Sequence, residues 1–122
     1  MTARRTIWEF RTEAGHTAGT DLIGFHVEAT DGAIGRVDKL SEEVDEQYLV
    51  VDTGPWILGR RVLLPAGTVT RIEIGEQKVY VDRTRDEIRN SPDLDAGDPD
   101  QEDDTRGRFG PYWDPYYGGR IL

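Results

Sequence analysis

The chain has 122 residues, no cysteine, and a formal net charge of −9 that comes from 24 acidic and 15 basic side chains. This length suits one domain, the lack of cysteine excludes disulfide frameworks and thiol chemistry, and the acidic charge disfavours a general nucleic-acid binder. No apolar run approaches the roughly 18 residues that cross a bilayer, and none follows Arg4 and Arg5 as in a signal peptide, so we expect a cytoplasmic protein without a transmembrane segment.

Residues 1–20 are predicted to be an N-terminal arm that precedes the main domain. Trp8 and Phe10 share one face of an extended chain and alternate with Ile7, which favours a strand or an extended arm. Gly15 and Gly19, with threonines close by, then give a flexible entry to the domain.

Residues 21–90 have the pattern of a β domain. Apolar and polar residues alternate from Phe25 to Ala29, as in a half-buried strand. An Asp-Gly pair at 31–32 then favours a tight hairpin turn. The polar, acidic segment 41–47 is expected to be a loop. Strands are predicted over residues 25–29, 34–40, 48–51, 60–64, 69–74 and 78–82.

One short helix is expected at the end of this domain. Thr84 and Glu87 have the spacing of a capping box, Ile88 is the expected core contact, and Pro92 ends the helix. Five to six short strands with one short C-terminal helix predict a mainly β fold, which we expect to be a small closed or partly open β-barrel.

The last part of the chain divides into a linker, residues 91–105, and a tail, residues 106–122. The linker carries seven acids and no base, so it repels itself and buries little apolar surface. The tail holds five of the eleven aromatic residues, and its Gly and Pro residues argue against a regular helix. Two interpretations stay open: a disordered tail, or a segment that docks on a neighbouring copy or another protein. The candidate anchors are Phe109, Tyr112, Trp113, Tyr116 and Tyr117.

The connection after Gly54-Pro55 is the second candidate interface. Trp56, Ile57 and Leu58 are three large apolar residues in a glycine-bounded segment. They either cap the open end of the barrel or form an exposed patch that becomes an interface. In the second case Arg60 and Arg61 supply a charged rim.

The residues that support catalysis or metal binding are few. His16 and His26 are the only histidines, and we expect both to be exposed side chains. The segment 93–98 resembles a calcium loop, but its glycine is out of register. The acidic cluster within 38–46 is expected to be a solvated loop. We therefore expect no catalytic, cofactor-binding or metal site, and no enzyme activity.

The order of several short motifs resembles the PRC-barrel domain. The matching pieces are Leu22-Ile23-Gly24, Val27, Asp31-Gly32, Ile34-Gly35, Val37, Tyr48–Asp52, Val62–Pro65, Val69 and Val79–Val81. Similar domains form the cytoplasmic part of the photosynthetic reaction-centre H subunit and the C-terminal half of the ribosome maturation factor. The stretch from Val51 to Trp56 is most similar to the stand-alone actinobacterial type.

The resemblance implies a scaffold that contacts other proteins, often as a dimer, without chemistry of its own. We therefore expect a non-catalytic protein–protein interaction or self-assembly module. Its partners are itself, as a homodimer or higher homo-oligomer, or other proteins, and no sequence-specific nucleic acid is expected. The alternative is a small-ligand or electron-transport accessory domain, by analogy with the reaction-centre H subunit.

Overall fold

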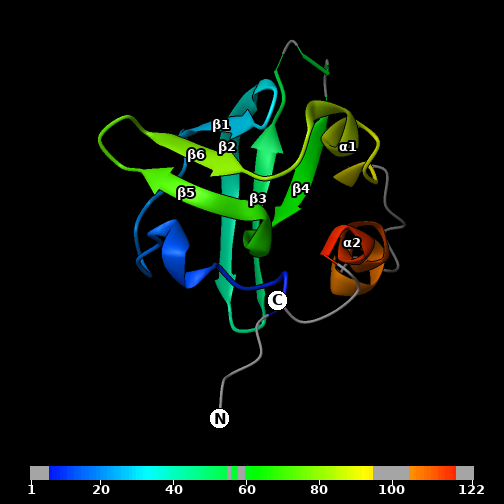
Figure 1. The fold of residues 1–122 in the computed structure, drawn as a ribbon, viewed down its shortest axis with the longest axis horizontal. Coiled ribbons are helices and arrows are strands. Elements are labelled where there is room, and N and C mark those ends of the chain that lie inside the picture. The colour runs from blue at the N-terminus through cyan, green and yellow to red at the C-terminus, as the bar shows by residue number, and fades with distance from the viewer. Residues whose placement is uncertain (1–5, 55, 58–59, 95–104, 118–122) are drawn as a thin grey trace.

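Six strands form one sheet that curls on itself (Figure 1). The computed structural model describes residues 6–54, 56–57, 60–94 and 105–117. The strands are β1 (His26–Ala29), β2 (Gly32–Glu43), β3 (Glu46–Asp52), β4 (Arg61–Pro65), β5 (Val69–Glu73) and β6 (Lys78–Val81). Their order is β4-β3-β2-β1-β6-β5, and the described strands show no pairing between β4 and β5. The mainly β, partly open barrel predicted from the sequence is therefore confirmed.

Only β1 and β6 pair in parallel, and the other neighbouring strands are antiparallel. Short helices complete the described ranges: η1 (Thr12–Ala14), η2 (Ala66–Thr68), α1 (Arg85–Arg89), α2 (Thr105–Trp113) and η5 (Asp114–Tyr117). Within these ranges, none is both long and apolar enough to span a membrane.

The neighbouring strands β3 and β4, of which β4 is an edge strand of the sheet, are buried on both faces, as their continuous apolar runs predict. Leu49 and Val51 are fully buried on one face. Val50 and Leu63 pair across the two strands on the other face, and they are only 2% and 1% exposed. A second layer must therefore cover the outer side of these strands.

Gly35 allows β2 to approach the end of β3. A Cβ atom at this position would lie 2.0 Å from the carbonyl oxygen of Asp52, and the φ angle of 150° is one that side chains disfavour. Glycine is therefore required here by the close approach of the two strands.

The predicted loop over 41–47 is wrong, because both strands continue through it. β2 runs to Glu43, β3 starts at Glu46, and only Val44 and Asp45 form the turn. The antiparallel pairing of β2 and β3 continues through this segment, with Ser41 opposite Tyr48. The Ser41 Oγ atom also donates to the Glu46 carbonyl oxygen at 2.8 Å. The polar residues thus form a solvent-exposed hairpin.

The N-terminal arm packs on the barrel without forming a strand in the described residues. Ile7 and Trp8 are both buried, so the expected alternation is not observed. The Ile7 carbonyl oxygen accepts from the Gly67 N–H at 2.7 Å, and that of Trp8 accepts from the Gln47 N–H at 2.9 Å. The arm therefore runs from η2 to β3, and the side chains of Ile7 and Trp8 are buried there.

The capping box of α1 is confirmed. The Thr84 hydroxyl accepts from the Glu87 N–H at 3.1 Å, and the Glu87 carboxylate accepts from the Thr84 N–H at 2.8 Å. Ile88 is fully buried, as expected. The helix is thereby fixed at the end of β6 with its outer face directed to solvent.

The expectation that the tail contains no regular helix is wrong. α2 includes Pro111 and is followed directly by η5. Pro111 lacks the N–H of one helical hydrogen bond, but Phe109 and Trp113 stand four residues apart on one face of the helix. They are 1% and 0% exposed, so the burial of two large rings outweighs the lost bond.

Candidate interaction surface around Trp56

Thr53 holds the described residues of the loop between β3 and β4. The Thr53 Oγ1 atom lies 2.7 Å from the Ile57 carbonyl oxygen and 2.6 Å from that of Arg60. The Trp56 N–H donates to the Thr53 carbonyl oxygen at 3.1 Å. Trp56 and Ile57 are thereby fixed at one end of the barrel, while Leu58 lies outside the described residues.

Trp56 is half-buried and lies against two arginines of α1. The guanidinium carbons of Arg85 and Arg89 are 4.8 Å and 5.2 Å from the centre of the indole ring. These arginines stand four residues apart, so they share one face of the helix. The indole also packs against the core cluster. Trp56 thus packs on the core as a cap would, and its role in an interface stays a prediction. We call Trp56, Ile57, Arg85 and Arg89 the Trp56 surface.

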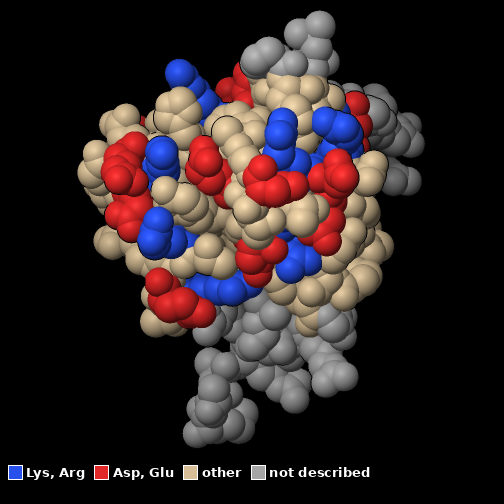
Figure 2. All heavy atoms as spheres, turned by 45° about the horizontal axis from the view of Figure 1, so that its top comes forward, with Lys and Arg blue, Asp and Glu red and all other residues tan. Residues whose placement is uncertain are grey.

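The guanidinium groups of Arg85 and Arg89 have no carboxylate partner among the described residues. The Nε atom of Arg85 is buried and has no hydrogen-bond partner there. By contrast, Arg11 and Arg83 both form ion pairs. Acidic and basic side chains are interspersed over this end of the barrel as a whole (Figure 2). The distinguishing feature is therefore local: two guanidinium groups without a carboxylate partner in the described ranges lie close to one aromatic ring.

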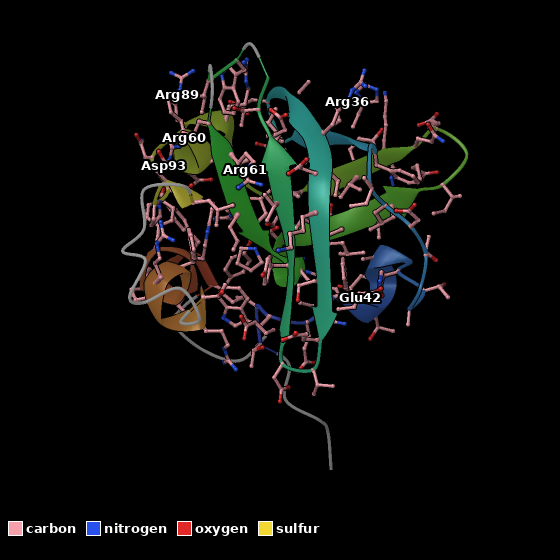
Figure 3. All side chains as sticks on the ribbon, turned by 180° about the vertical axis from the view of Figure 1, so that it is seen from behind. Arg36, Glu42, Arg60, Arg61, Arg89 and Asp93 are labelled. Atoms are coloured by element: carbon pink, nitrogen blue, oxygen red, sulfur yellow. The ribbon has the colours of Figure 1, made fainter. Side chains whose placement is uncertain are left out.

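Arg60 and Arg61, the expected rim, have other contacts. The Arg60 guanidinium donates to the carbonyl oxygens of Arg89 and Ser91, so it caps the end of α1 (Figure 3). Arg61 forms an exposed ion pair with Asp38 at 3.0 Å. Sequence reasoning missed Arg85 and Arg89, although their spacing within a capped helix was a usable signal.

The structure places the tail aromatics on the barrel of their own chain. Phe109 and Trp113 join the core cluster, and the Tyr112 hydroxyl donates to the Glu87 carbonyl oxygen at 2.5 Å. Burial, together with the neighbouring Tyr116 hydroxyl, raises the pKa of Tyr112. Tyr116 remains 38% exposed. The tail therefore contributes two buried aromatic rings to the core of its own chain, and a docking role in another copy or another protein stays a prediction.

Asp82 joins the arm, the barrel and the tail. Its carboxylate pairs with Arg11 at 2.5 Å and with Arg83 at 3.3 Å, and it accepts from the Tyr117 hydroxyl at 2.6 Å. Arg11 also donates to the Gly67 carbonyl oxygen at 2.7 Å. Burial first, and then the hydrogen bond to Asp82, raise the pKa of Tyr117. The Asp82 network thus locks both terminal segments in place.

A shallow hollow of about 240 Å³ lies beside the Trp56 loop. It is lined by His26, Ala33, Gly35, Arg36, Asp52, Thr53 and Gly54. This volume is below the range of about 300–1,000 Å³ that is usual for small-molecule sites.

The other histidine, His16, stacks on Phe10 and contacts Glu42 at 3.1 Å. No group of three metal-ligating side chains occurs in the described ranges.

The sequence comparisons agree with this architecture. No curated protein matches the chain significantly. The family model of the PRC-barrel domain matches residues 15–88, which is more than half of the chain and includes all six strands. Domains of this type are generally not catalytic. The chain therefore belongs to the PRC-barrel domain family.

Proposed function

We propose that the protein is a non-catalytic interaction module and that the Trp56 surface is its docking site. The observation that carries this proposal is the half-buried Trp56 ring in contact with the guanidinium groups of Arg85 and Arg89, which have no carboxylate partner among the described residues. Tryptophan and arginine are the residue types most enriched among the residues that dominate binding energy at protein interfaces.

Hydrogen bonds hold the described parts of the Trp56 surface in place before a partner arrives. Thr53 contacts Ile57, and the helix is held by its capping box and by Arg60 at its other end. A pre-organised surface loses little conformational entropy on binding, so a small number of contacts suffices for useful affinity. Each guanidinium group also offers several donors to a partner's carboxylate or carbonyl oxygens.

The test compares Trp56→Ala with Tyr80→Ala. Tyr80 is also half-buried and also lies under an arginine, with the Arg71 guanidinium carbon 4.4 Å from its ring, but it belongs to β6. We expect Trp56→Ala to weaken association by about 30-fold, which corresponds to loss of an interface anchor worth about 2 kcal/mol. Tyr80→Ala should leave association unchanged.

Association is measured by sedimentation velocity of the purified protein and by quantitative crosslinking in the native cell. The free energy of unfolding of each variant is measured in urea. If Trp56→Ala associates normally but is much less stable, Trp56 is a core cap and the proposal is wrong. A strictly monomeric wild type that gives no crosslinks also contradicts it.

A further inference from the structure

We propose that the Trp56 surface receives the β2–β3 hairpin tip of a second copy, so that copies of the chain associate head to tail. The hairpin tip is Glu43, Val44 and Asp45. This inference rests on the proposed function, because it names the partner of the same surface.

The hairpin tip presents an apolar side chain between two carboxylates. Val44 is 88% exposed, more than any other large hydrophobic side chain that the structure describes. Its neighbours Glu43 and Asp45 are exposed too, and neither forms an ion pair within the described ranges. Because β2 and β3 pair up to Glu43 and Glu46, the tip is held as a defined two-residue turn.

The two features are complementary in charge. The Trp56 surface has an aromatic ring in contact with two cations, and the hairpin tip has an aliphatic side chain whose two neighbours in the sequence are anions. Val44 on the indole would bury apolar surface, while its neighbours approach Arg85 and Arg89. Guanidinium–carboxylate pairs are short and directional, so they fix the register of such a contact.

The two features lie at opposite ends of the same barrel. The β3–β4 loop and α1 are at the top of Figure 1, and the β2–β3 turn is at the bottom. In Figure 3, Arg89 and Glu42, the residue before the tip, are likewise far apart. One chain therefore cannot bring its own tip to its own Trp56 surface, and a second copy must supply one of them.

Head-to-tail contact is favoured over a two-fold dimer by the charges. Two Trp56 surfaces placed face to face would bring like guanidinium groups together at the centre of the contact, and two tips would do the same with carboxylates. In a head-to-tail contact each cation meets an anion. Such an interface uses different surfaces on the two copies, so it continues into rings or chains unless it is capped.

Charge reversal and mixing test this arrangement directly. Arg89→Glu reverses one side and Glu43→Lys the other, and both side chains are exposed, so folding should be unaffected. Glu76→Lys is the control for Glu43→Lys, because it makes the same charge change in the exposed β5–β6 turn. Sedimentation velocity and native mass spectrometry follow each protein over a concentration series at physiological salt.

We expect self-association of the wild type, a loss of about tenfold or more in each reversed variant, and no loss in Glu76→Lys. Mixing Arg89→Glu with Glu43→Lys should restore association, because each interface then joins opposite charges.

If Arg89→Glu weakens self-association but Glu43→Lys does not, the inference is wrong while the docking site stands. If the wild type is monomeric, the inference is also wrong. The proposed function would still be supported if the wild type forms crosslinks to another protein and Trp56→Ala abolishes them. Self-association that neither variant changes contradicts the inference, and if Trp56→Ala also leaves it unchanged, the proposed function fails too.

Discussion

Replacing Trp113 with alanine tests whether the tail is part of the folded domain. Trp113 is fully buried in the core cluster, although it lies more than 20 residues beyond the end of the family match. A buried aromatic side chain removes about 150–250 Å² from water, which at about 25 cal/mol per Å² stabilises the fold by about 4–6 kcal/mol. The substitution should therefore lower the free energy of unfolding substantially.

Two effects reduce this figure. The Nε1 atom of Trp113 is buried without a hydrogen-bond partner in the described part of the chain. Its removal recovers a desolvation penalty of about 1–3 kcal/mol. In addition, α2 can detach as a whole, so the loss cannot exceed the free energy with which the tail docks. We therefore expect Trp113→Ala to lose about 2–4 kcal/mol.

Urea unfolding followed by circular dichroism measures this loss. The control is Tyr116→Ala, because Tyr116 lies beside Trp113 but is 38% exposed, and it should lose less than about 1 kcal/mol. Limited trypsin digestion at Arg106 and Arg108 reports detachment of α2 independently. A Trp113→Ala variant as stable as the wild type and equally resistant to trypsin would refute the docked tail.

Two further predictions concern the Asp82 network and the barrel. Tyr117→Phe should reduce the alkaline sensitivity of the fold: the pKa of Tyr117 is raised in the folded protein, so its contribution is complete below pH ~10 and is lost as the pH rises. Above that pH the free energy of unfolding of the wild type should fall by up to about 1.4 kcal/mol per pH unit more than that of Tyr117→Phe in parallel urea titrations, and equal slopes would contradict this. Gly35→Ala should lose about 2–4 kcal/mol in urea unfolding, because its Cβ would collide with the Asp52 carbonyl oxygen. Gly75→Ala, whose Cβ meets open space, should lose little, and a similar loss in both would exclude the steric explanation.

The strand pattern could be predicted from the sequence because its signals are local. Alternation around Val27 and the apolar run at Leu49 depend only on neighbouring residues. The same locality explains the two errors of secondary structure. Polar residues at 41–47 indicate exposure, and an exposed hairpin is as polar as a loop. Pro111 weakens a helix locally, but the burial of Trp113 against the barrel is a long-range effect that no window of sequence reports.

The candidate site was predicted only in part for the same reason. Trp56 could be singled out from the sequence because it is a large apolar residue that directly follows Gly54-Pro55. Its partners Arg85 and Arg89 are about 30 residues further along the chain and meet it only because α1 folds back over the end of the barrel. The rim predicted for Arg60 and Arg61 stays a prediction, and the structure adds that the Arg60 side chain donates to the carbonyl groups that end α1.

The docked termini restrict where a partner can bind. The aromatic side chains of the tail are not all free for a partner, because Phe109 and Trp113 are buried in the core cluster. Instead α2 lies beside β4, and the Asp82 network fastens the arm and the tail together (Figure 1). The apolar and aromatic groups that the described residues leave partly exposed at the two ends of the barrel include Trp56 at one end and Val44 at the other. The charged residues beside Trp56 and beside Val44 are of opposite sign, and this complementarity is the basis of the proposed head-to-tail contact.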